Sequence, residues 1–112
     1  MNQTERNEYL ETKWVGPGWM PIVRELDAQL SFIDPDYTIV QVKEKFGGLR
    51  YYIDSEKNSE EMYKLISIAE GRCWRVCESC GSTNSVTTDK NPEDGHYRVL
   101  TLCNKCLNWR YE

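Results

Sequence analysis

Histidine is almost absent from this chain, and so are the motifs that mark common enzymes. The 112 residues include a single histidine, His96. There is no GxxxxGK(S/T) phosphate-binding loop, no GxSxG nucleophile elbow, and no HxE followed by PCxxC as in zinc deaminases. Because general acid–base chemistry relies most often on histidine, we expect a protein without enzymatic activity.

Long apolar runs are missing as well. No stretch approaches the ~20 apolar residues that a membrane span requires, and the first eight residues, MNQTERNE, are polar throughout. Charged residues make up 29% and hydrophobic residues 39%, as in ordinary soluble globular proteins. We therefore expect a cytoplasmic protein, whose thiols stay reduced.

Basic residues are in deficit. Fourteen Lys and Arg face eighteen Asp and Glu, which gives a net charge of −4. Such a charge opposes unspecific binding to a phosphate backbone and favours a basic partner.

The sequence does contain two CxxC pairs. Cys77 and Cys80 form the first pair, Cys103 and Cys106 the second, and 22 residues separate them. Thiolates at this spacing are the preferred tetrahedral ligands of zinc, so the four cysteines predict one structural Zn²⁺ ion. A disulfide framework, redox chemistry or inert thiols are the alternatives. Four cysteines also close the coordination sphere, unlike the three protein ligands of a catalytic zinc.

Two further residues could approach this metal. Cys73 precedes the first pair by four residues, at the expected end of a helix, and we expect it to be a small buried hydrophobe. His96 lacks a partner at metal-ligand spacing and is expected in a solvated hairpin. Gly81 follows the first pair, where a left-handed residue is needed, and Asn104 is expected to serve the second pair similarly.

Periodicity predicts an α+β fold. Apolar residues at helical spacing predict an amphipathic helix that starts near Pro21 and ends at the Asp34-Pro35-Asp36 segment. Two β-prone runs, 37–46 and 49–53, flank Gly47-Gly48 and predict a hairpin. A second helix follows residue 59, and a zinc-ribbon-like module closes the chain. We expect residues 1–76 to form a helix, hairpin and helix region, with residues 77–112 as a zinc module packed on it in one compact unit.

The hairpin carries the one basic cluster. Strand alternation places Gln41, Lys43 and Lys45 on one face, which Arg50 and Tyr52 share in a suitable register. Lys43, Lys45 and Arg50 are therefore candidate partner-binding residues, although a merely solvated face is the simpler interpretation. The opposite face is expected to be apolar, with Glu44 on that side in a buried ion pair. The residues expected to point inward are Val40, Val42, Leu49 and Tyr51.

Four tryptophans are many for a chain of this length. Tryptophan is both a core residue and a frequent contributor to binding hot spots. Trp19 and Trp74 adjoin apolar periodic segments, so we expect them in the core. Trp14 and Trp109 lie in less patterned flanks and are the candidate contact residues.

The run KEKFGGLRYY at residues 43–52, with the upstream Gly18-Trp19 helix and the paired CxxC motifs, resembles a family of small zinc-ribbon proteins of phages and prophages. The likeness covers roughly residues 14–107. It implies a mobile-element origin and a place in the host bacterial cytoplasm. It also suggests similarity to zinc-containing anti-CRISPR inhibitors of a Cas9-type nuclease, a basic protein partner that an acidic inhibitor would be steered toward.

Two functions follow as expectations. The first is a non-enzymatic phage or prophage accessory protein that uses a structural zinc and inhibits a host defence nuclease by binding it. The alternative is a nucleic-acid-binding zinc-ribbon module that uses Lys43, Lys45, Arg50 and neighbouring aromatic residues.

Overall fold

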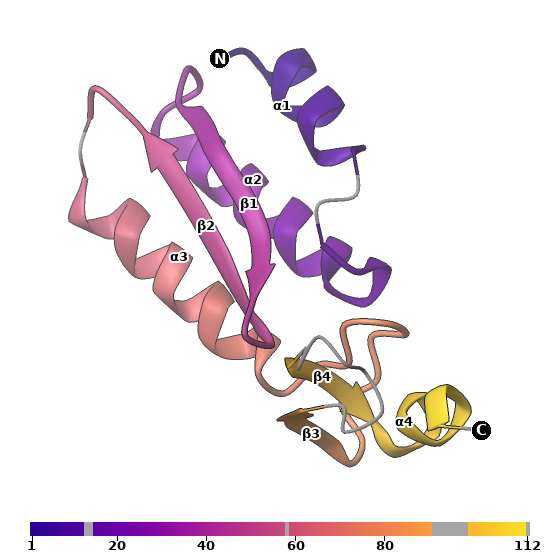
Figure 1. Ribbon diagram of the computed structural model, residues 1–112. Coiled ribbons are helices and arrows are strands. Elements are labelled where there is room, and N and C mark those ends of the chain that lie inside the picture. The colour runs from indigo at the N-terminus through magenta and orange to yellow at the C-terminus, as the bar shows by residue number, and fades with distance from the viewer. Residues whose placement is uncertain (13–14, 58, 91–98, 112) are drawn as a thin grey trace.

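The computed structural model describes the backbone of residues 1–12, 15–57, 59–90 and 99–111, and the side chains of these residues except 90 and 108–111. Its elements, in chain order, are α1 (Gln3–Leu10), η1 (Pro17–Trp19), α2 (Met20–Ile33), β1 (Thr38–Lys45), β2 (Gly48–Asp54), α3 (Glu60–Cys73), β3 (Val86–Lys90), β4 (Val99–Cys103) and α4 (Asn104–Tyr111) (Figure 1). The predicted α+β class is confirmed. Within the described part of the chain, no helix is both long and apolar enough to cross a membrane.

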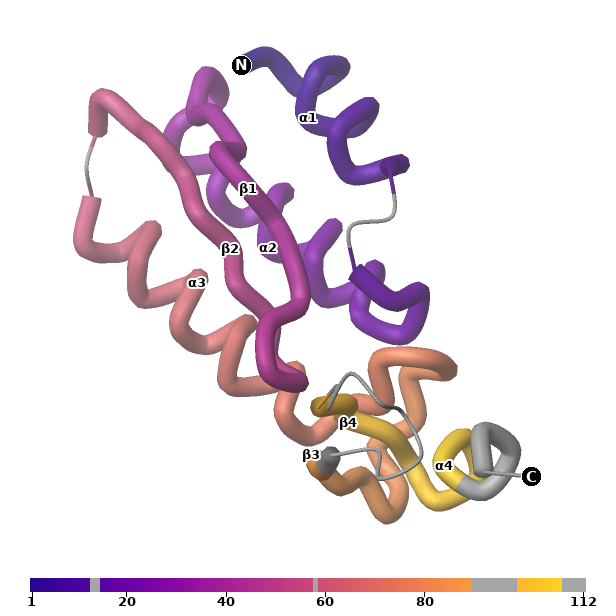
Figure 2. Tube along the Cα trace, in the orientation of Figure 1, coloured from indigo at the N-terminus to yellow at the C-terminus, as the bar shows by residue number. Residues whose placement is uncertain are grey.

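The two central helices cover one face of the β1–β2 hairpin (Figure 2). Both helices are amphipathic, as their apolar spacing predicts, and proline stands in the first turn of α2, where its missing amide costs nothing. Ser59 caps α3 by accepting a hydrogen bond from the Glu61 amide at 3.2 Å. The helix residues buried in this core are Ile22, Val23, Leu26 and Leu30 of α2 and Met62, Ile66, Ala69 and Cys73 of α3.

The hairpin differs from expectation at its turn and at one bulge. Lys45 pairs with Gly48, so the two turn residues are Phe46 and Gly47, both with positive φ, rather than the two glycines. The register shifts between Ile39 and Gln41. Such a bulge turns the extra residue away from its expected face. Val40 is therefore exposed, and its prediction as an inward residue is wrong, whereas Val42, Leu49 and Tyr51 are buried.

Glu44 does not form the expected buried ion pair. No carboxylate–cation contact of Glu44 occurs among the residues that the structure describes. Instead, its Oε1 accepts a hydrogen bond from the Gly47 amide at 2.7 Å. In a two-residue turn the Gly47 amide has no partner on the opposite strand. The Glu44 carboxylate supplies that partner and so stabilises the turn.

Helix α1 was not expected from the sequence. Asn2 and Glu5 form a capping box at its N-terminus. The helix is held by Arg6, whose guanidinium is buried and pairs with Asp27 of α2 at 2.9 Å. Arg6 also donates to the carbonyl oxygens of Met1, Pro35 and Tyr37. The hydrogen-bonded Arg6 side chain thus fixes α1 to the core, in place of the apolar stripe from which helices are usually predicted.

Side chains close both edges of the two-stranded hairpin. The Val42 amide donates to the hydroxyl of Tyr9 from α1 at 3.0 Å. On the other edge, the Tyr51 amide donates to Glu70 Oε2 from α3 at 3.1 Å. Each contact satisfies an outward-facing strand amide, at an edge where unpaired groups invite unspecific pairing.

The C-terminal module consists of the antiparallel β3–β4 hairpin and α4. The strands agree with the predicted ribbon, although the segment between them lies outside the described residues. Its core is small and includes two of the cysteines: Cys77, Leu100, Leu102 and Cys103. Helix α4, which was not predicted from the sequence, carries Cys106 of the second CxxC pair.

Two hydrogen bonds between described residues, and a third beside them at Val76, connect this module with the rest of the chain. The Gly18 amide donates to the Glu78 carbonyl, and Trp19 Nε1 donates to the Val76 carbonyl, each at 2.8 Å. The buried Thr101 hydroxyl donates to the Gly47 carbonyl in the hairpin turn. The division of the chain at residue 76 stays a prediction, and the Gly18–Glu78 and Thr101–Gly47 hydrogen bonds cross it.

Candidate metal centre

The first CxxC pair lies in a tight turn just after α3. The Gly81 amide donates to the Cys77 carbonyl at 2.9 Å, and Gly81 has a φ of 83°. The expected left-handed glycine is thus confirmed. The turn also aims the Cys80 amide at Cys77 Sγ, at 3.5 Å. Backbone amides directed at sulfur stabilise a thiolate, which is the form that binds metal.

The second pair is built differently. Cys103 ends β4 and Cys106 lies in the first turn of α4. Asn104 is helical, so its expected left-handed conformation is wrong. The left-handed residue is instead Ser85, with φ 52°, whose carbonyl accepts from the Asn104 amide at 3.1 Å. The residue just before β3 thus holds the first residue of α4, between the two cysteines of the second pair.

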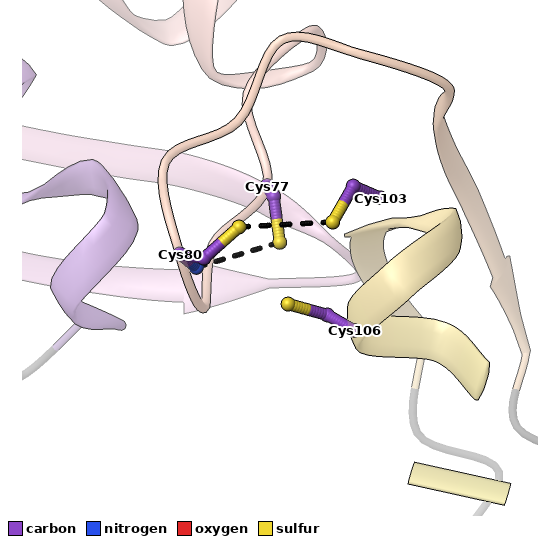
Figure 3. Close-up of side chains that lie close together, drawn as sticks. All are labelled: Cys77, Cys80, Cys103 and Cys106. Atoms are coloured by element: carbon purple, nitrogen blue, oxygen red, sulfur yellow. Dashed lines mark hydrogen bonds between the residues drawn. The ribbon is translucent and has the colours of Figure 1, made fainter. Parts of the chain in front are cut away.

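The four sulfur atoms converge on one point (Figure 3). All four lie within 4.8 Å of one another, and Cys80 Sγ lies 3.6 Å from Cys103 Sγ. A tetrahedral Zn²⁺ with Zn–S bonds of about 2.3 Å requires sulfur separations of about 3.8 Å. The cysteines are free of disulfides. Cys77, Cys80, Cys103 and Cys106 thus form a plausible site for a single zinc ion.

No protein-family model matches this chain, and no curated protein or solved structure is significantly similar to it. The metal centre therefore rests on the chain's own residues.

Two thiols of this cluster differ in pKa. Burial opposes ionisation of Cys77, but hydrogen bonds from the backbone of Cys103, Cys80 and Ser79 outweigh it and lower the Cys77 pKa to about 7. Burial and hydrogen bonds to the other thiols raise the pKa of Cys106 to about 12. Four thiolates cannot coexist at this distance without a cation. Zinc binding would hence release protons and weaken as the pH falls.

Cys73 stays apart from the metal cluster. Its side chain is fully buried in the core between α2 and α3, as predicted, and it is not among the four clustered cysteines. Burial raises the pKa of its thiol to about 12, so the neutral form persists at physiological pH. His96 lies outside the described residues.

The candidate contact residues fall into two groups. Lys43 pairs with Arg50 across the hairpin, and Gln41 with Tyr52, so the predicted common face is confirmed in its register. Trp14 and the side chain of Trp109 lie outside the described residues. Whether any of these residues binds a partner stays a prediction.

Trp74 was wrongly expected in the core. The residue is 41% exposed, in contrast to fully buried Trp19. It follows α3 and lies against Gly48, where a Cβ atom would come within 2.6 Å of the ring. The signal that sequence reasoning missed is the second glycine after Phe46, which makes room for an aromatic ring rather than a turn.

Proposed function

We propose that this protein is a non-enzymatic binding protein whose zinc centre is structural and whose acidic end docks on a basic macromolecular partner. Following the resemblance of the KEKFGGLRYY run, the partner proposed is a host defence nuclease of the Cas9 type, which a phage or prophage accessory protein would inhibit. The closed four-cysteine set supports the structural role, because a catalytic zinc keeps one position open.

One surface carries the proposal. A groove of about 530 Å³ lies at the open end of the hairpin, away from the zinc module. Four carboxyl side chains line it, those of Asp34, Asp36, Asp54 and Glu56, against Lys57 and the amino group of Met1. Asp36, Asp54 and Glu56 are exposed. Such a groove fits lysine or arginine side chains from a basic protein surface.

The remaining carboxylate is fixed in place. The Ser55 hydroxyl donates to Asp34 Oδ2 at 2.5 Å, and the Asp36 amide donates to Asp34 Oδ1 at 3.0 Å. The hydrogen bond from Ser55 is the main reason that the pKa of Asp34 is lowered, and it outweighs the opposing effect of desolvation. Asp34 therefore stays ionised at physiological pH, and negative charge in the groove would accelerate encounter with a positive partner.

The test combines complex formation with a functional readout. Zinc-loaded protein is mixed with a Cas9-type nuclease and its guide RNA, and co-elution in size-exclusion chromatography is measured alongside guide-directed DNA cleavage. We expect a complex, inhibited cleavage, and weaker association as salt screens the charges. Asp54→Asn/Glu56→Gln should slow association on the order of tenfold at low salt.

The matched control is Glu8→Gln/Glu11→Gln, which removes two exposed acidic charges from α1 and the residue that follows it. This control should leave association unchanged within about twofold, because neither charge lines the groove that faces the partner. Equal effects of both pairs would show that net charge, not the groove, matters. If no basic protein is retained, from purified nucleases or from a bacterial lysate, the proposed function is wrong.

A further inference from the structure

The outer face of the β1–β2 hairpin combines features that the fold does not need. Its inner face is buried against α2 and α3, while the outer face presents cations and aromatic rings. We name this surface the hairpin face. Its residues are Gln41, Lys43, Lys45, Phe46, Gly48, Arg50, Tyr52 and the ring of Trp74.

Its centre is a pair of like charges. Lys43 and Arg50 lie directly opposite each other in the antiparallel register, and Lys45 follows on the same face. Side chains at such positions have Cβ atoms about 4.5–5.5 Å apart, so two cations there repel. Among the described residues, none of these three forms an ion pair within 4.0 Å. An anionic ligand placed between them would remove the repulsion.

The turn holds a second feature that costs stability. Phe46 adopts a left-handed φ of 54°, a conformation that favours glycine or asparagine, yet the residue remains 68% exposed. The strain therefore brings no core packing in return. Lys45 Nζ lies 5.6 Å from the centroid of this ring, so the turn presents a cation beside an aromatic face.

Two further rings complete the row. Gly48 alternates with Arg50 and Tyr52 along β2, so a Cβ at Gly48 would point to the outer face, where it would meet Trp74. Trp74 and Tyr52 are 41% and 45% exposed. Residues four apart in a strand are roughly 13 Å from each other, so Arg50 lies between two aromatic platforms.

We propose that the hairpin face binds a short single-stranded segment of nucleic acid, with Lys43, Lys45 and Arg50 contacting phosphates and Phe46, Trp74 and Tyr52 stacking on bases. Cations that alternate with exposed rings are the usual platform for single strands. An acidic peptide offers the charge but no rings to stack, and a duplex keeps its bases inside the helix.

This inference goes beyond the acidic groove and uses the other end of the hairpin. The groove includes Asp54, which pairs with Thr38 at the open end, whereas Lys45 and Gly48 flank the turn. Opposite charges are thus separated along one hairpin. A partner that carries nucleic acid on a basic surface could contact both regions, but each can be tested alone.

The experiment measures fluorescence anisotropy of labelled oligothymidylate with the full-length, zinc-loaded protein. Three phosphate contacts predict a salt slope of about −2, which means a roughly 20-fold loss of affinity between about 50 and about 200 mM salt. Lys43→Gln and Arg50→Gln should each reduce the slope by about 0.7. Lys64→Gln on the exposed side of α3 is the charge-matched control and should leave the slope unchanged.

The decisive variant is Phe46→Gly. It removes a stacking ring, so affinity should fall roughly 5- to 150-fold, while relief of the left-handed strain should keep or raise the melting temperature. Phe32→Ala, at an exposed phenylalanine on α2, is the control and should not change affinity. Loss of binding with a preserved fold separates a binding role from a structural one.

Several results would overturn the inference: no binding at low salt, equal effects of test and control variants, tighter binding of a matched duplex, or equal binding of polyglutamate. Asp54→Asn/Glu56→Gln should not weaken oligothymidylate binding. Failure of the hairpin face therefore leaves the proposed protein partner standing, and failure of the groove leaves the hairpin face standing.

Discussion

The region before Cys77 and the module after it are held together by different means. The first buries a continuous apolar core shared by α1, α2, the hairpin and α3, and adds the Arg6–Asp27 pair at one end. The second has a core that includes two of its own metal ligands, Cys77 and Cys103. A module this small cannot bury enough apolar surface to fold alone, so we expect it to depend on zinc in a way that the first region does not.

Metal removal should produce the largest difference in stability between the two regions. Structural zinc sites contribute about 10–16 kcal/mol of apparent binding free energy, so chelation should unfold the module. Amide resonances of residues 77–107 should lose dispersion, while those of α2 and the β1–β2 hairpin persist. Metal analysis should give one zinc per chain. Folded preparations that consistently lack zinc would contradict the site itself.

Arg6→Ala should destabilise the region before Cys77 and leave the zinc module folded. It leaves the Asp27 carboxylate buried without its cation and should cost about 3–5 kcal/mol in the free energy of unfolding, with zinc retained. Arg72→Ala removes a cation from the exposed Glu25–Arg72 pair at 2.8 Å and is the control. Because water screens that pair, its loss should cost at most about 1 kcal/mol. Equal costs in urea denaturation would contradict a special role for the buried pair.

The contact between the two regions can be tested by adding one methyl group at Gly18. Gly18→Ala would press a Cβ against the Cys77 carbonyl oxygen, so we expect a loss of about 1–3 kcal/mol and faster zinc loss to a chelator. Gly71→Ala is the matched control, because nothing lies within 4 Å of a Cβ there, and helix propensity should make it neutral or stabilising by up to ~1 kcal/mol. An unchanged rate of zinc loss in Gly18→Ala would show that this contact does not support the metal centre.

Sequence reasoning succeeded where one physical signal dominates. Apolar spacing at Ile22, Leu26 and Leu30 predicted α2, and the CxxC spacing predicted the sulfur cluster, because both signals are local. Helix α1 was not predicted because its anchor is a buried arginine, and the partners that fix it to the core, Asp27 and Tyr37, lie more than 20 residues away. Long-range satisfaction of a polar group leaves no periodic trace.

The bulge at Val40 and the position of Trp74 were not predicted from the sequence for a related reason. A bulge shifts strand alternation by one residue, and nothing in the letters around Val40 marks it. Trp74 sits where α3 ends beside Gly48, a contact between elements that are separate in sequence. In the metal site, ligand identity was predictable, whereas the role of Ser85 was not.

The smallest expected effect concerns the fifth cysteine. Cys73→Ala should retain zinc and lose on the order of 1 kcal/mol of stability, because it removes only a small buried group. Cys77→Ala, which removes a ligand, should lose zinc. Equal zinc loss from the two variants would show that Cys73 is a ligand after all.

The Cys73 thiol also makes a pH-dependent contribution with a defined sign. Because burial raises its pKa to about 12, the folded protein holds this proton more tightly than the unfolded chain does. The stabilisation is therefore fully present below about pH 8.5 and is lost as the pH rises toward 12. In zinc-loaded protein near pH 8, iodoacetamide should label Cys73 far more slowly than a free thiol, and urea should restore the normal rate. Rapid labelling of native Cys73 would place its thiol at the surface and contradict its assignment to the core.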